Sequence, residues 1–185
     1  MNDWIRDRRL DAVFLHRPWQ LKEIPDGVGV IFYHHAFDEH LTMGFNPRLA
    51  SILGMQQIQP FGEKSGRAIG MIAVVRSQPV EAFRQRVQET FGRWEHFVAG
   101  RFSNLDRVAV VGALTPELIQ AAAAENVQVY ATGQLREAAT AAIRETGIEV
   151  IATGHRRCEE WGLRSLAGIL QERFANLSVL LPPLK

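Results

Sequence analysis

Three short segments of the chain contain the residue types that bind metal ions in proteins. The first is DAVFLHRPW (residues 11–19), which contains His16. The second is VIFYHHAFDEH (residues 30–40), with three histidines and two carboxylates among eleven residues. The third is TGHRRCEEW (residues 153–161), which contains His155, Cys158 and Glu159. Imidazole nitrogens and carboxylate oxygens are ligands for zinc, manganese and iron, so the three segments together suggest a metal site.

The elements that would carry these segments follow from the hydrophobic pattern. Short runs rich in apolar and β-branched residues predict strands at residues 12–15, 28–32, 68–75, 108–111, 127–130 and 148–151. Helical periodicity and capping residues predict helices at residues 79–91, 116–125, 135–145 and 159–174. Turn-rich residues 59–66 are expected to form a loop, and a last short strand is expected near residues 177–180. The alternation predicts a single α/β domain over residues 1–185, with a mainly parallel or mixed sheet flanked by helices.

The ligand candidates follow separate predicted strands. His16, the pair His34 and Asp38, and His155 each come after the end of a strand, which is where open α/β sheets bind ligands. If a helix begins near His155, then His155 and Glu159 are four residues apart on one helix face and can bind one cation. We therefore expect His16, Asp38, His155 and Glu159 to converge in one cleft at the carboxyl edge of the sheet.

Simpler structural roles compete with this interpretation. His16 can be a hydrogen-bonded residue at the end of a strand. His155 and Glu159 can be an ordinary pair at the start of a helix. Cys158 can be a buried residue that packs as a small hydrophobe.

Composition narrows the class of protein. The chain has 185 residues, a formal net charge of +1 and one cysteine, so it forms no internal disulfide. It lacks a clustered basic stretch, which argues against a nucleic-acid partner, and it lacks an apolar run long enough for a membrane span. The polar start MNDWIRDRRLD does not resemble a signal peptide. We expect a cytoplasmic protein with no membrane association.

The three segments resemble the Nif-three-like family, also called GTP cyclohydrolase type-two homologues. The resemblance is good over residues 11–50 and from residue 107 to the C-terminus, including NVQVYATGQLREAATAAIRETGIEVIATGH. It implies a homo-oligomeric ring, a hexamer by analogy with the family, with one or two divalent ions (zinc, manganese or iron) per chain. It further implies that the metal ligands are His16, Asp38, His155 and Glu159. Arg17 and His34 are expected to lie next to these ligands without binding the ion.

Three departures from the family pattern affect this expectation. Arg17 occupies the position of a second histidine, and a guanidinium is always protonated and has no lone pair for a metal. We expect Arg17 to pair with Asp38 and to weaken or abolish the second metal position, with His34 or His40 as replacements for the lost imidazole. Gln134 occupies the position of an acidic residue. The chain also begins at what resembles the family's second strand, which is expected to expose apolar sheet surface that another copy covers.

Two functions fit the sequence. The first is a metal-dependent hydrolase, similar to a GTP cyclohydrolase type two, that uses a metal-activated water on an unknown small-molecule substrate. The second is a non-catalytic, ring-forming protein that binds metal or a partner through a degenerate metal site. A plain α/β domain without a metal is the third interpretation.

Overall fold

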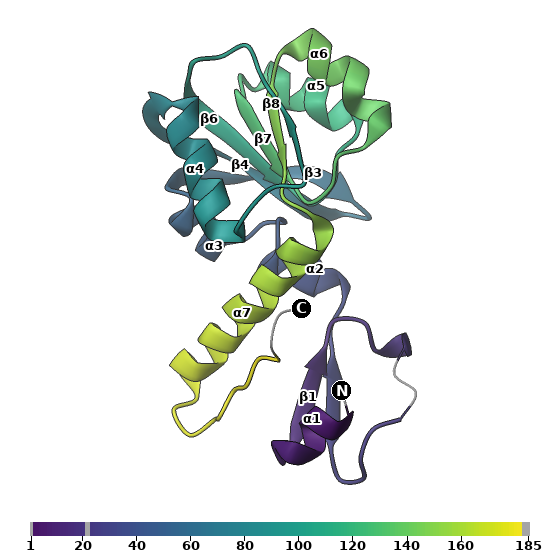
Figure 1. Ribbon diagram of the computed structural model, residues 1–185. Helices are drawn as coiled ribbons and strands as arrows, with labels where there is room; N and C mark the ends of the chain where they lie inside the picture. Colours follow the sequence, from purple (N-terminus) through teal and green to yellow (C-terminus); the bar gives the residue numbers. More distant parts are fainter. Residues whose placement is uncertain (1, 21–22, 183–185) are drawn as a thin grey trace. The chain divides into compact units, whose positions relative to one another are not determined.

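The computed structural model of this protein describes residues 2–20 and 23–182, which contain both helices and strands along their length (Figure 1). The chain forms two compact units, one ending at Phe37 and the other beginning at Asp38. That the chain acts as one domain stays a prediction. Among the helices in the described ranges, none combines the length and the apolar character needed to cross a membrane.

The larger unit is built on a mixed sheet of six strands. Its strands lie in the order β3 (Met55–Lys64), β4 (Arg67–Pro79), β6 (Asn104–Val111), β7 (Val129–Thr132), β8 (Glu149–Ala152) and β5 (His96–Val98). The pairs β6–β7 and β7–β8 are parallel, whereas β3–β4, β4–β6 and β5–β8 are antiparallel. The sheet is therefore mixed, which confirms the expected α/β fold with a mainly parallel or mixed sheet.

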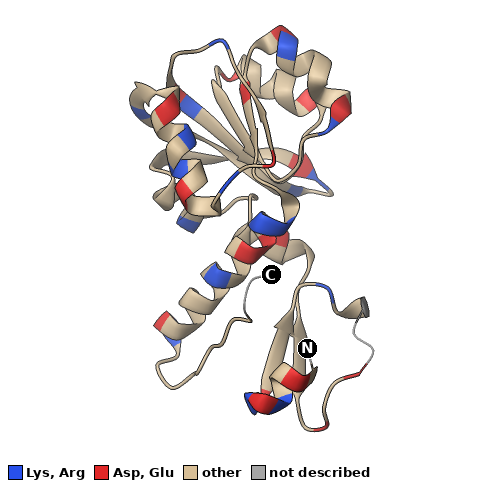
Figure 2. Ribbon diagram, in the orientation of Figure 1, with Lys and Arg blue, Asp and Glu red and all other residues tan. Residues whose placement is uncertain are grey.

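Helices cover both faces of this sheet, because alternate strand residues point to opposite sides. One core cluster joins the sheet to α3 (Pro47–Ile52), α4 (Val80–Phe91) and α7 (His155–Arg173). The other cluster joins it to α5 (Pro116–Ala124), η2 (Glu137–Ala139) and α6 (Thr140–Thr146). Figure 2 shows that charged residues of both signs lie mostly on the helices and loops, for example along α4 and α7.

Local sequence signals explain where several helices begin and end. Thr115 caps α5, since its Oγ1 accepts a hydrogen bond of 3.2 Å from the Leu118 N–H, and Pro116 follows at the first helical position. Asn46 caps α3 in the same way before Pro47. Gly147 ends α6 in the left-handed conformation, with φ of 67°.

The smaller unit contains α1 (Asn2–Asp7), β1 (Ala12–Leu15), η1 (Pro18–Gln20), β2 (Gly29–Phe32) and the start of α2 (His35–Leu41). β1 and β2 pair in parallel, with Leu15 opposite Phe32, and form a separate two-stranded sheet. Phe37 is fully buried and packs 5.8 Å from the Phe14 ring, between ring centroids. All four residues of β2 are exposed.

Several expectations about the elements are wrong. Residues 59–66 are not a loop, because most of them belong to β3, which turns into β4 at Ser65 and Gly66. Residues 177–180 lie in the described part of the chain and form no strand there. The strands preceding the three ligand segments do not share one sheet, since β1 and β2 are separate from the sheet that contains β8.

Candidate metal centre

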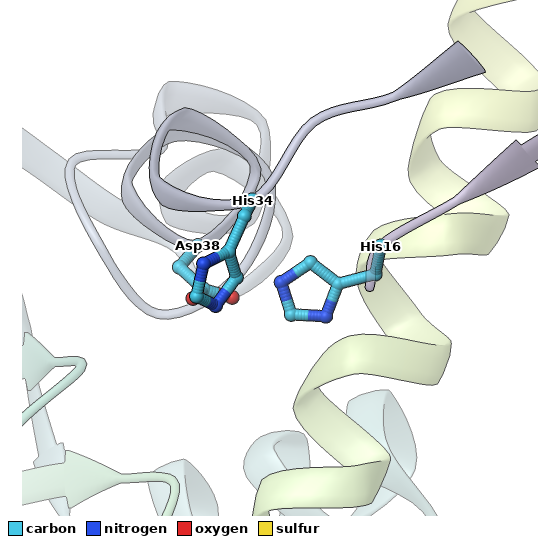
Figure 3. Close-up of side chains that lie close together, drawn as sticks. All are labelled: His16, His34 and Asp38. Carbon is cyan, nitrogen blue, oxygen red and sulfur yellow. The ribbon is translucent and has the colours of Figure 1, made fainter. Parts of the chain in front are cut away.

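Two histidines and one aspartate come together at the start of α2. Each of His16, His34 and Asp38 offers one ligand atom, and these atoms all lie within 4.8 Å of one another. Figure 3 shows the His16 ring directed toward His34 and Asp38. All three residues are partly buried, as expected of groups that bind a ligand reached from solvent.

The elements of the smaller unit determine where the two imidazoles lie. His16 directly follows β1, and His34 lies two residues beyond the end of β2. Because the strands are parallel and end in register, both histidines emerge at the same end of the two-stranded sheet. The His16 ring lies 4.9 Å from the His34 ring and 4.7 Å from the buried Phe37 ring, between centroids, and Trp19 meets His34 edge-on at 5.5 Å. These ring contacts restrict the rotation of both imidazoles.

Helix α2 positions the carboxylate. Asp38 lies four residues after His34, in the first turn of α2. The backbone carbonyl of Asp38 accepts a hydrogen bond of 2.7 Å from the Thr42 hydroxyl. The neighbouring Glu39 is largely buried and accepts a hydrogen bond of 2.8 Å from the Arg67 guanidinium. This ion pair joins α2 to the start of β4.

A second pair of candidate ligands lies on α7. The helix begins at His155, four residues before the start expected at residue 159, and His155 Nε2 lies 3.0 Å from Glu159 Oε1. The expectation that these residues share one helix face is therefore confirmed. The His155 side chain is 56% exposed and the Glu159 side chain 26%, so solvent reaches both.

Cys158 is a packing residue and not a ligand candidate. Burial raises the pKa of its thiol to about 12, and the nearby carboxylates of Glu159, Glu95 and Asp38 add to the increase, although the hydrogen bond with Thr153 lowers it. A thiol binds a metal as the thiolate, which this environment disfavours.

The structure thus brings together some of the expected residues. His16 and Asp38 belong to one group, and its third member is His34, which was expected near the ligands or as a substitute for the lost imidazole. The signal that identifies His34 is its spacing of four residues from Asp38 at the start of a helix. The convergence of both pairs on one ion, and the pairing of Arg17 with Asp38, stay predictions.

The donor set at His16, His34 and Asp38 fits a divalent cation. Two imidazoles and one carboxylate are a common ligand set for zinc and iron, with positions left open for water or substrate. Ligand atoms around such an ion are about 3.5 Å apart, given bonds of about 2 Å. The atoms of this group lie within 4.8 Å of one another, so their largest separation exceeds that spacing by at most about 1.3 Å.

Comparisons with known proteins agree with the resemblance of the sequence. A family model described as Duf34/NIF3 (NGG1p interacting factor 3) matches residues 7–182. A Pseudomonas aeruginosa protein named GTP cyclohydrolase 1 type 2 homolog is 30% identical over 150 residues, which cover 80% of this chain and 59% of that protein. This chain therefore spans less than two thirds of the length of that relative.

Two crystal structures show the same fold. A protein from Thermus thermophilus has a TM-score of 0.72 at 18% identity, with coverage of 100% of this chain and 79% of its own. A Bacillus cereus protein related to NIF3 has a TM-score of 0.68 at 13% identity, with coverage of 94% and 80%, respectively.

Proposed function

Because this chain belongs to the Duf34/NIF3 family, we propose that it binds a divalent metal ion and acts as a metal-dependent hydrolase. The observation that carries the proposal is the group of His16, His34 and Asp38, whose ligand atoms lie within 4.8 Å of one another. The name of the Pseudomonas aeruginosa relative suggests GTP as the first substrate to test. We propose zinc, manganese or iron as the ion.

The side chains of the group have separate tasks in this proposal. His16 and His34 offer neutral imidazole lone pairs, and Asp38 offers a negative charge that offsets part of the charge of the cation. Phe37 and Trp19 hold the two rings by aromatic contact. A divalent ion bound to such a set supplies a Lewis acid, which lowers the pKa of water toward neutrality. From the family pattern, we propose His155 and Glu159 as further ligands.

Metal titration tests the binding step. Asp38→Asn keeps the size of the side chain but removes its charge, and it is expected to weaken zinc binding at least about tenfold, as does His16→Ala. His40→Ala is the matched control, because His40 is an exposed histidine on the same helix but outside the group. Equal zinc affinity in wild type and in both ligand variants would show that this group does not bind the ion.

Turnover tests the hydrolase. Wild-type protein loaded with zinc or manganese is incubated with GTP, and the products are separated by chromatography. We expect hydrolysis that chelator removes, that added metal restores, and that Asp38→Asn lacks. Metal binding without turnover of GTP or other nucleotides would favour the second function, a non-catalytic metal- or partner-binding protein.

That second function has its own support in Arg17. Arg17 directly follows His16 in the chain, and its guanidinium cannot bind a metal ion. A site with fewer ligands than the family pattern is consistent with a structural or residual ion.

We further propose that the protein forms a homo-oligomer, a ring by analogy with the family pattern, with neither nucleic acid nor membrane as a partner. Exposed large apolar side chains in the smaller unit support this: they belong to Trp19, Val30, Ile31, Phe32 and Tyr33, and Trp19 is 63% exposed. Such a group of side chains is typical of a surface covered by a protein partner. Light scattering is expected to show an oligomer for the wild type and a smaller species for Ile31→Lys. A monomeric wild type at micromolar concentration would contradict the proposal.

A further inference from the structure

Helix α7 begins without a side-chain cap. Its N-cap residue is Gly154, with φ of 105° and no side-chain hydrogen bond to the first turn, and the first turn contains no acidic residue. The carboxylate of Glu95 lies against this position, since a Cβ atom on Gly154 would overlap Glu95 Oε1. A negative charge near a helix N-terminus is favourable, because the unpaired N–H groups there carry partial positive charge.

Two contacts hold Glu95 in place, one through its backbone and one through its carboxylate. The Glu95 backbone N–H donates a hydrogen bond of 2.8 Å to the carbonyl of Ala152, at the end of β8. Arg157 Nη1 donates a hydrogen bond of 3.2 Å to Glu95 Oε1, and the same nitrogen lies 3.5 Å from the carbonyl of Thr153. Arg157 comes from the first turn of α7, so the pair joins that turn to the edge of the sheet.

We propose that Glu95 and Arg157 form a positioning pair that fixes the first turn of α7 and thereby orients His155 and Glu159. Neither Glu95 nor Arg157 follows from the family pattern as a ligand. The inference rests on the proposed metal function, in which His155 and Glu159 are ligands. Residues that orient ligands commonly change metal affinity when they are mutated, although they do not touch the ion.

A competing explanation is that Glu95 only adds negative charge near the cation. The two explanations predict opposite effects of Arg157→Gln. If charge alone matters, the removal of a positive charge tightens metal binding, whereas the loss of a positioning pair weakens it. The double variant Glu95→Gln/Arg157→Gln separates them again, because residues that act as one pair give effects that do not add.

Two measurements test the proposal. Cobalt titration, followed by the visible absorption of the bound ion, gives the affinity. Hydrogen exchange of the metal-free protein reports on the first turn of α7 through the Cys158 amide, which donates a hydrogen bond of 3.1 Å to the Gly154 carbonyl. We expect Glu95→Gln and Arg157→Gln each to weaken cobalt binding about tenfold, with no larger loss in the double variant. In both single variants we expect exchange in the first turn to be roughly threefold faster.

Glu172→Gln is the matched control. Glu172 lies near the other end of α7 and accepts a hydrogen bond of 2.7 Å from Arg48, so this variant also breaks an exposed ion pair of the same helix. Its cobalt affinity and the exchange of the first turn are expected to match the wild type.

Tighter cobalt binding by Arg157→Gln, or unchanged exchange in Glu95→Gln, would overturn the positioning pair. If the wild type binds no cobalt, the proposed metal function fails, and the exchange measurements then decide the positioning of the first turn alone.

Discussion

Arg84→Met tests how strongly a buried ion pair stabilises the larger unit. The guanidinium of Arg84, on α4, donates two hydrogen bonds to the carboxylate of Glu149, at 3.2 and 2.8 Å. The Glu149 side chain, at the start of β8, is only 4% exposed, and that of Arg84 is 21% exposed. The variant removes the guanidinium and leaves a carboxylate buried without it.

The expected loss follows from this burial. Removal of one partner from a buried pair costs about 3–5 kcal/mol, and partial exposure of Arg84 places this case near the lower end, at about 3 kcal/mol. The Arg84 guanidinium also lies 4.5 Å from the centre of the Phe97 ring, which adds about 0.5 kcal/mol. The pair Arg48–Glu172 has the same two-pronged geometry, at 3.0 and 2.7 Å, but its side chains are 40% and 62% exposed.

Urea denaturation followed by circular dichroism measures the difference. Arg84→Met is expected to lower the free energy of unfolding by about 3.5 kcal/mol. Arg48→Met is expected to leave the midpoint unchanged, since water screens that pair. The double variant Arg84→Met/Glu149→Leu is expected to lose less than Arg84→Met alone, because it removes the buried charge as well.

Two results would refute this reasoning. Equal losses in Arg84→Met and Arg48→Met would show that geometry, and not burial, determines the contribution of these pairs. A double variant less stable than Arg84→Met would show that the buried carboxylate is not the source of the loss.

Three other predictions concern single residues. The thiol of Cys158 is expected to resist disulfide exchange reagents at pH 8 in the folded protein. Because folding raises its pKa from 9.0 to about 12, its contribution to stability is complete below pH 9 and is lost as the pH rises toward 12. A comparison of alkaline unfolding between wild type and Cys158→Ala measures this loss. Asn46→Ala is expected to lower the free energy of unfolding by about 2 kcal/mol in urea denaturation, since it removes the cap of α3 and three hydrogen bonds of a buried side chain. A loss below about 0.5 kcal/mol would contradict that role. Arg17→His is expected to add a second zinc position in a titration, and two equally tight positions in the wild type would show that Arg17 does not weaken the site.

The parts of the fold that were predictable are those with strong local signals. The strand expected at residues 12–15 forms as β1 with the same bounds, because its apolar residues are bordered by polar ones. The helix expected from residue 79 forms as α4, where the apolar side chains repeat with helical spacing. The pair His155 and Glu159 was predictable because a helix places residues four apart on one face.

Strand β3 was missed for a physical reason. It is the edge of the six-stranded sheet, and most of its side chains are polar or partly exposed, so the sequence lacks the alternation typical of a half-buried strand. Gln57 has a positive φ of 51° at a register shift, and Pro60 and Gly62 interrupt the run. Its strand conformation depends on pairing with β4 over residues 67–75, because its own residue types do not favour a strand.

For the candidate site, the sequence by itself determined which residues have metal-binding chemistry, because the imidazoles and carboxylates follow short apolar runs at recognisable spacings. It also determined the family, through three segments that carry these residues. The tertiary structure alone decided that β1 and β2 form a sheet of their own, and that His34 joins His16 and Asp38. Strand pairing and ring contacts connect residues far apart in the chain, and their energies depend on distances that no local pattern of residues encodes.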